Sequence, residues 1–355
     1  MKLEKLGWDS EWEARFSPFH EKGLAPGRVA VEDKHHYIAL TSQGHLTAQV
    51  AGKVLHNAES TAALPKVGDW VALTPLPNED KGVIHHVLPR KTKLSRKLPG
   101  REVEEQMLVA NIDLVFIVQP LDREYNPRLV ERHLIMVHEG GAQPVVVLNK
   151  TDLCPNLAQR LDDARGAAGD APVVAASAKL GEGIEELQRF IKPGTTVVFV
   201  GASGVGKSSL INALYGDEVQ ATAEVRESDA KGRHMTTWRE MIILPNGGLV
   251  IDTPGMREFQ MWLADEGVQG TFTDIEEVGT RCHFRNCSHT VEKKCAVLAA
   301  VESGEITQER YNNYLKLRRE LEFLEQAHTR HGYLERRRRT RVAQRAFEKF
   351  KRDEH

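Results

Sequence analysis

Residues 201–208 read Gly-Ala-Ser-Gly-Val-Gly-Lys-Ser, a pattern that is typical of a phosphate-binding P-loop. The glycines let backbone N–H groups approach phosphate oxygens, Lys207 brings a positive charge to the β- and γ-phosphates, and the Ser208 hydroxyl can ligate Mg²⁺. An apolar run over 196–200 precedes the motif and a helical pattern over 208–214 follows it, which is the strand–loop–helix context that this chemistry requires. The sequence therefore predicts a nucleoside triphosphate site formed by Gly201, Ala202, Ser203, Gly204, Val205, Gly206, Lys207, Ser208 and Ser209.

Two shorter motifs predict that the base is guanine. Residues 149–152 read Asn-Lys-Thr-Asp, and residues 177–179 read Ser-Ala-Lys. The Asp152 carboxylate can accept hydrogen bonds from the N1–H and the exocyclic amine of guanine, and adenine would leave it unpaired at a cost of roughly 1–3 kcal/mol. The other motif residues should complete the base site: Asn149 ties this loop to the P-loop, the Lys150 stem covers the purine face, and Ser177, Ala178 and Lys179 bring the Ala178 N–H to the guanine O6.

A third group of residues should hold Mg²⁺ and respond to the γ-phosphate. Asp252 ends the apolar run 249–251, where an acidic residue positions Mg²⁺ in P-loop enzymes, and the Gly255 N–H can contact the γ-phosphate. Thr236 and Thr237 lie between the P-loop and Asp252, and the sequence does not decide which of them ligates Mg²⁺.

The residue that orients the attacking water is not evident from the sequence. Met256 occupies the position where many GTPases have a glutamine, and methionine cannot orient water. His234 is a candidate for that role, and a structural histidine in the loop is the alternative. We therefore expect slow unaided hydrolysis, since even small GTPases with the glutamine reach only about 10⁻⁴–10⁻³ s⁻¹.

The order of these motifs is unusual. Both guanine motifs normally follow the P-loop, whereas here residues 149–152 and 177–179 precede residues 201–208. The sequence therefore predicts a circularly permuted GTPase domain.

Four potential metal ligands lie close together in the sequence: Cys282, Cys287, His289 and Cys295. Three thiolates and one imidazole suit tetrahedral Zn²⁺, and a full set of four protein ligands is typical of a structural site. The alternative is a set of unliganded thiols with a surface histidine. Cys154 stands apart from this cluster, and we expect an ordinary buried thiol there.

The hydrophobic pattern predicts three kinds of domain. Short strands at 28–31, 37–40, 46–50, 70–73 and 82–87 favour a small β-barrel of the OB type, with a plain β-meander as the alternative. Continuous apolar runs at 112–118, 144–148, 172–175, 196–200, 241–244 and 249–251 indicate an α/β domain with a mostly parallel sheet. We expect an N-terminal extension over 1–26, the barrel over 27–95, the GTPase domain over 96–274, and an α-rich zinc-binding domain with a basic helical tail over 275–355.

Composition limits the class of protein. The chain has 355 residues, 28% of them charged, with a formal net charge of −2. No apolar stretch reaches the ~18 residues that a membrane span needs, and the first residues do not resemble a secretory signal. Clustered cysteines favour metal binding in a reducing cytoplasm over disulfides. The arginine-rich stretch 336–352 indicates contact with a nucleic-acid backbone, with a solvated helix face as the alternative.

Taken together, the barrel with Val67-Gly-Asp69, the permuted motifs, Gly232-Arg-His234 followed by threonines, and the cysteine cluster resemble the ribosome small subunit-dependent GTPase A family. The resemblance covers nearly the whole chain. It implies an OB-fold domain, a permuted GTPase domain, a zinc-binding domain, and a late factor in maturation of the small ribosomal subunit whose GTP hydrolysis the subunit stimulates. Met235 departs from the family pattern, since a first threonine is usual there, and the N-terminal extension and the arginine-rich tail are not core family features.

These expectations leave three functional hypotheses. The first is a monomeric, membrane-free GTP hydrolase that acts as an assembly checkpoint and contacts rRNA. The second is an RNA-binding assembly chaperone whose affinity is set by GTP, with hydrolysis of minor importance. The third, a P-loop kinase or ATPase, conflicts with the guanine motifs. The permuted order also places Gly255 within about 25 residues of the cysteine cluster, so a γ-phosphate-dependent shift could pass to the zinc module.

Overall fold

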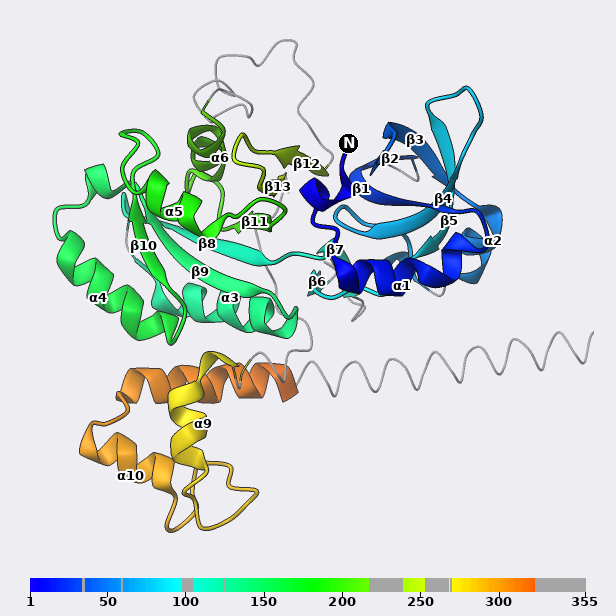
Figure 1. Ribbon diagram of the computed structural model, residues 1–355. Coiled ribbons are helices and arrows are strands. Elements are labelled where there is room, and N and C mark those ends of the chain that lie inside the picture. Colours follow the sequence, from blue (N-terminus) through cyan, green and yellow to red (C-terminus); the bar gives the residue numbers. More distant parts are fainter. Residues whose placement is uncertain are drawn as a thin grey trace, which may run out of the picture.

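The computed structural model describes residues 1–33, 36–58, 60–97, 105–123, 125–216, 239–252, 268 and 270–322. Within these ranges it contains a closed barrel, an α/β sheet and a small C-terminal helical module (Figure 1). No helix in the described ranges combines the length and the apolar character needed to cross a bilayer.

The N-terminal segment forms a short 3₁₀ helix, Leu3–Leu6, and the helix α1, Ser10–His20. The carboxylate of Asp9 caps α1 by accepting a hydrogen bond of 2.8 Å from the Trp12 N–H. Trp8 packs edge-on against Trp70 with ring centroids 4.6 Å apart, and Phe16 is fully buried. The N-terminal segment therefore packs against one side of the barrel.

Five strands close the barrel in the order β1-β2-β3-β5-β4-β1, in which β3 pairs in parallel with β5 and the other pairs are antiparallel. Alternate residues of β2 and β3 are buried, as expected for strands with one face on a core. All five strands predicted for the barrel are observed. Their bounds are β1 Ala25–Asp33, β2 His36–Thr41, β3 Gly44–Val50, β4 Trp70–Pro75 and β5 Lys81–Val87, with the short helices α2 Gly52–Asn57 and Thr61–Ala63 before β4.

A hairpin that the sequence pattern did not predict joins the barrel to the next domain. Its strands are β6, Lys93–Lys97, and β7, Glu105–Ala110, which pair antiparallel. The expected domain boundary after residue 95 falls inside β6, and the one after residue 274 falls inside a later helix, α9.

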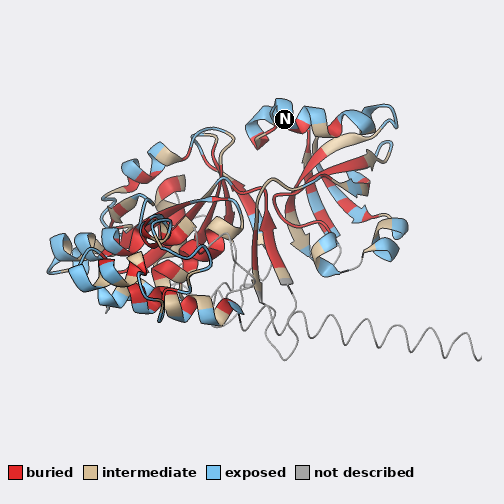
Figure 2. Ribbon diagram, turned by 90° about the horizontal axis from the view of Figure 1, so that it is seen from below, coloured by how far each residue is buried: buried red, intermediate tan, exposed pale blue. Residues whose placement is uncertain are grey.

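The α/β sheet runs in the order β10-β9-β8-β11-β13-β12. Its central strands are parallel and almost completely buried, as the apolar runs predicted (Figure 2). The bounds are β8 Leu114–Pro120, α3 Pro127–Glu139, β9 Gln143–Asn149, Thr151–Leu153 (3₁₀), α4 Leu157–Ala168, β10 Val173–Ala176, α5 Ile184–Phe190, β11 Thr196–Val200, α6 Lys207–Tyr215, β12 Arg239–Ile243 and β13 Leu249–Asp252.

One of the runs assigned to the parallel sheet has the opposite direction. The run 241–244 lies largely in β12, which pairs antiparallel with β13 on one side and with β1 of the barrel on the other. Only a few residues separate β12 from β13, and a parallel pair needs a crossover of a dozen or more. The barrel and the α/β domain therefore share one continuous sheet.

The C-terminal module packs beneath α3 (Figure 1). It consists of α9, Thr273–Gly279, a loop that carries the cysteine cluster, α10, Ala296–Ser303, and a helix over residues 308–322. Tyr314 of this last helix packs edge-on against Phe272, with ring centroids 5.4 Å apart. The α-rich character expected for this part is present in its described residues, and the arginine-rich stretch 336–352 lies outside them.

Candidate functional site

The P-loop lies between the buried strand β11 and helix α6, at the carboxyl edge of the sheet. Gly206 ends the loop with φ of 98°, and a Cβ there would lie 2.2 Å from the side-chain nitrogen of Asn149. Only glycine allows both this backbone conformation and this close approach. The Lys207 ammonium donates to the carbonyl oxygens of Gly201, at 2.8 Å, and Ala202, at 3.0 Å, so the charge lies against the loop that should hold the phosphates.

Asn149 connects three motifs that are distant in the sequence. Its side-chain nitrogen donates to the Val205 carbonyl of the P-loop at 2.9 Å, which is the tie expected from the sequence. Its side-chain oxygen accepts a hydrogen bond of 3.2 Å from the Ala178 N–H. This is the N–H group that was expected to donate to the guanine O6. The two base-reading motifs and the P-loop are thus held together at one edge of the sheet.

Asp152 and Ser177 also meet. The Ser177 hydroxyl, on a fully buried residue, donates to Asp152 Oδ1 at 2.6 Å and accepts from the Leu180 N–H at 3.2 Å. This pair of bonds fixes the orientation of the Asp152 carboxylate, which is otherwise at an exposed position. The arrangement suits a carboxylate that reads the N1–H and amine of guanine. Lys150, next to it, has the left-handed backbone conformation with φ of 67°.

The residues expected to ligate Mg²⁺ are only partly described. Ser208 lies in the first turn of α6, and Asp252 ends β13, whose pairing with β11 is parallel. Both residues therefore lie at the same edge of the sheet. Four residues assigned to catalysis or Mg²⁺ lie outside the described part of the chain: His234, Thr236, Thr237 and Gly255. Met256 also lies outside it.

A side chain that sequence reasoning missed contacts the base-reading loop. Asp122 follows β8, and its carboxylate bonds the ammonium of Lys150. No motif spacing marks Asp122, and the only signal was its position just beyond the carboxyl end of an apolar strand, where open α/β sheets bind ligands.

Cys282, Cys287, His289 and Cys295 converge in the C-terminal module, with their ligand atoms within 4.8 Å of one another. Cys282 Sγ lies 3.8 Å from Cys295 Sγ, and the His289 Nδ1 lies 3.6 and 3.5 Å from these two sulfurs. Tetrahedral Zn²⁺ with Zn–S of about 2.3 Å and Zn–N of about 2.0 Å requires separations of about 3.8 Å between two sulfurs and about 3.5 Å between sulfur and nitrogen. The four residues therefore fit a tetrahedral metal ion.

Backbone N–H groups favour a thiolate at Cys282, whereas burial raises the pKa of Cys287 to about 12. The Ala296 N–H donates to Cys282 Sγ at 3.3 Å, and the Leu298 N–H donates to Cys295 Sγ at 3.5 Å, at the start of α10. Burial acts to raise the pKa of Cys282, but the backbone N–H donors outweigh it and bring that pKa below its ordinary value. The Tyr311 hydroxyl donates to the His289 carbonyl at 2.6 Å and fixes the loop from the other side. Cys154, expected to be buried, is half-buried and lies outside this cluster.

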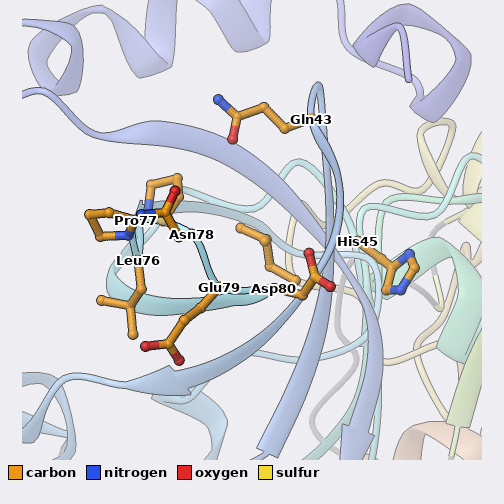
Figure 3. Close-up of a pocket in the computed structure, with 9 residues that line it drawn as sticks. Gln43, His45, Leu76, Pro77, Asn78, Glu79 and Asp80 are labelled. Carbon is orange, nitrogen blue, oxygen red and sulfur yellow. The ribbon is translucent and has the colours of Figure 1, made fainter.

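The barrel carries a shallow groove of about 340 Å³ at the end formed by the β2–β3 and β4–β5 turns (Figure 3). Its lining includes Gln43, His45 and Asn78 together with the carboxylates of Glu79 and Asp80. Two carboxylates disfavour a phosphate ligand. We assign this groove no part in the nucleotide site.

Comparison with known proteins agrees with this geometry. Residues 87–262 match the family model described as RsgA GTPase. A small ribosomal subunit biogenesis GTPase RsgA from Opitutus terrae is 44% identical over 329 residues, which cover 90% of each chain. A protein named small ribosomal subunit biogenesis GTPase RsgA 2, from Lactiplantibacillus plantarum, is 43% identical over 85% of each chain.

Solved structures show the same architecture. The crystal structure of YjeQ from Thermotoga maritima matches with a TM-score of 0.64 and 29% identity, over 84% of this chain and 98% of that one. The structure of YloQ, described as a circularly permuted GTPase, matches with a TM-score of 0.59 over 84% and 95% of the two chains, and at 24% identity it supports the fold alone.

Proposed function

This chain belongs to the RsgA GTPase family, and we propose that it hydrolyses GTP as a switch that acts on the small ribosomal subunit late in its maturation. The observation that carries the proposal is the position of Asn149, which joins the P-loop to both guanine motifs in a chain whose relatives are named small ribosomal subunit biogenesis GTPases. That junction ties recognition of the base to the loop that holds the phosphates.

Each residue of the nucleotide site would have a separate role. Asp152, oriented by Ser177, selects guanine, and the Lys150 stem covers the purine face. Lys207 and the backbone N–H groups of the P-loop neutralise the phosphates and hold them in line for attack. When bound, Mg²⁺ supplies further neutralisation of the charge that develops in phosphoryl transfer. We propose Ser208 and Asp252 as residues that hold it, with Thr236 or Thr237 completing the set and His234 orienting the water.

We propose that the metal of the C-terminal cluster is one Zn²⁺ with a structural role. Three sulfurs and one imidazole nitrogen at tetrahedral separations support this assignment. We also propose that the chain divides into an extension, a barrel, a GTPase domain and a zinc-binding domain.

Contact with the ribosome should involve rRNA. The arginine-rich stretch 336–352 supports this because Lys and Arg clusters bind phosphate backbones and release counterions. We further propose that the chain acts as a cytoplasmic monomer and that the small subunit stimulates hydrolysis.

The nucleotide dependence of subunit binding tests the switch. Binding to purified small subunits should be tighter with a non-hydrolysable GTP analogue than with GDP, because only the γ-phosphate can order Gly255 together with Thr236 or Thr237. Single-turnover hydrolysis, measured with and without subunits, completes the test. Equal affinity in both nucleotide states would contradict the switch, and tight GTP-dependent binding without faster hydrolysis would indicate an assembly chaperone instead.

A further inference from the structure

Asp122 lies in the loop after β8, directly beside the base-reading loop. Its Oδ2 bonds the Lys150 ammonium, and its Oδ1 accepts from Arg123 Nε at 3.1 Å. The backbone fixes the same neighbourhood, because the Leu121 N–H donates to the Asn149 carbonyl at 2.9 Å. The loop 121–123 therefore forms an additional wall next to the guanine motifs.

The Asp122–Lys150 pair is more constrained than an ordinary surface ion pair. Only 23% of the Asp122 side chain and 26% of the Lys150 side chain are exposed. Lys150 has φ of 67°, which is uncommon for a residue other than glycine. This backbone conformation fixes the direction in which its side chain leaves the loop. Partial burial acts to raise the pKa of Asp122, but the bonds from Lys150 and Arg123 outweigh it and keep the carboxylate ionised.

The other contact of Asp122 leads toward the P-loop. Arg123, which Asp122 holds through its Nε, has a terminal nitrogen 3.7 Å from the point where a Cβ on Gly204 would lie. Asp122 thus lies between a lysine of the base-reading loop and an arginine beside the phosphate-binding loop. Through these two side chains Asp122 is linked to both loops of the candidate nucleotide site.

We propose that Asp122 is a positioning residue for guanine-nucleotide binding, which anchors the Lys150 ammonium so that its stem lies across the purine face. The inference rests on the proposed role of Lys150 in the guanine site. A long lysine side chain loses rotamer freedom when it covers a base, and a fixed anion at its end reduces that loss on binding because the chain is already oriented. The anchor does not read the base, so it should act on GTP and GDP alike.

Affinity and dissociation rates of fluorescent GDP and a fluorescent GTP analogue test this proposal. Asp122→Asn should weaken both nucleotides by the same factor, roughly three- to fivefold, the size expected for a partly exposed ion pair. The preference for guanine over adenine should be unchanged, since Asp152 is intact. Asp162→Asn is the matched control: Asp162 pairs with Arg165 at 3.3 Å on α4 and is 78% exposed, and its neutralisation should change neither rate nor affinity.

A double-mutant cycle separates anchoring from a general structural effect. Lys150→Met keeps an apolar stem but lacks the ammonium, so adding Asp122→Asn to it should cause no further loss. An undiminished loss in the Lys150→Met background, or no loss in Asp122→Asn alone, would overturn the proposal. Selective guanine binding by the unmodified chain is the separate check on the site itself, so failure of the proposed function would be seen independently of Asp122.

Discussion

Asp152 is the carboxylate that we propose selects guanine. Its orientation depends on the buried Ser177, whose hydroxyl donates to it at 2.6 Å. Specificity of this kind arises because a wrong base leaves a positioned polar group without its partner. The base that the site prefers should therefore depend on which hydrogen-bond donors and acceptors the side chain of residue 152 offers.

Asp152→Asn should change the preferred base from guanine to xanthine. An asparagine amide can accept from the N1–H and donate to the xanthine oxygen, where a carboxylate can only accept. We expect GTP affinity to fall by about 5- to 150-fold, corresponding to a loss of roughly 1–3 kcal/mol, and xanthosine triphosphate affinity to rise. Competition binding measures both. A variant that keeps its full GTP preference would show that this loop does not read the base.

At this scale the sequence predicted most of the described site, because motif spacing is local. The tie from Asn149 to the P-loop could be anticipated from residues 149–152 and 201–208 alone. The contact of Asp122 with Lys150 could not be anticipated, because Asp122 follows a different strand and is not part of a sequence motif. Its contact depends on the pairing of β8 with β9, which only the fold establishes.

Among the elements, helix α3 connects the α/β sheet to the C-terminal module. Arg310 of the helix over 308–322 contacts Glu131 of α3 at 3.2 Å and bonds Asp274 at 2.6 and 2.9 Å. Its guanidinium also lies over the Phe272 ring at 4.8 Å. Burial raises the pKa of Glu131 to about 7, although the charge of Arg310 acts to lower it.

The Glu131 carboxyl should make stability fall as pH rises. Between its ordinary pKa of 4.5 and its folded pKa of about 7, the folded state holds a proton that the unfolded state has lost, so the free energy of unfolding decreases through this window and levels off above it. Glu131→Gln resembles the protonated form. Its advantage over the unmodified chain should be smallest near pH 5 and should reach on the order of 1–3 kcal/mol at pH 8.

Urea unfolding at pH 5, 6, 7 and 8 measures this difference. Glu305→Gln is a suitable control, because Glu305 lies in the same module, is 56% exposed and pairs with Arg281 at 3.2 Å on the surface. An advantage for the glutamine variant that shrinks with rising pH would mean that the ion pair with Arg310 outweighs the burial of Glu131.

The C-terminal module should depend on its metal. The purified chain should contain about one zinc, and Cys287→Ala should unfold the module while leaving nucleotide binding largely intact, because structural zinc in small peptides contributes roughly 10–16 kcal/mol. Cys154→Ala, outside the cluster, should keep its zinc. Elemental analysis and limited proteolysis provide the readouts. Absence of zinc from a reducing, chelator-free preparation would refute the assignment.

The sequence predicted strands correctly where their hydrophobic periodicity was sufficient. It did not predict features that depend on which strands pair with each other. The barrel strands and the buried parallel strands follow from alternating and continuous apolar runs. The direction of β12 and the hairpin of β6 and β7 depend on which strands become neighbours. An apolar run such as 241–244 carries no information about its direction.

For the whole molecule, the important feature is that the barrel and the GTPase domain are not independent units. Strand β1 of the barrel pairs with β12, which places Glu32 opposite Arg239. The buried Arg28 adds a second junction: it donates to the Asn111 carbonyl at 3.0 Å and to the Thr196 hydroxyl at 2.7 Å, and it also bonds the Leu6 carbonyl. Such long-range contacts could not be deduced from the sequence, because nothing local to Arg28 marks its partners.

This continuity bears on how a ribosomal partner could influence hydrolysis. The barrel meets the sheet at β12, and the C-terminal module meets α3, so each flank is joined to an element next to the candidate nucleotide site. Because Met256 cannot orient water, we expect the isolated chain to hydrolyse GTP no faster than the ~10⁻⁴–10⁻³ s⁻¹ that small GTPases with the glutamine reach unaided.

The most direct test of the central claim is the steady-state GTPase rate of the full chain alone and with equal concentrations of purified small subunits, large subunits and naked rRNA. Lys207→Ala serves as the inactive control, since it lacks the charge that neutralises the phosphates. The account predicts acceleration by orders of magnitude with small subunits and little change with the other two. Equal stimulation by large subunits or naked rRNA, or none by small subunits, would contradict it.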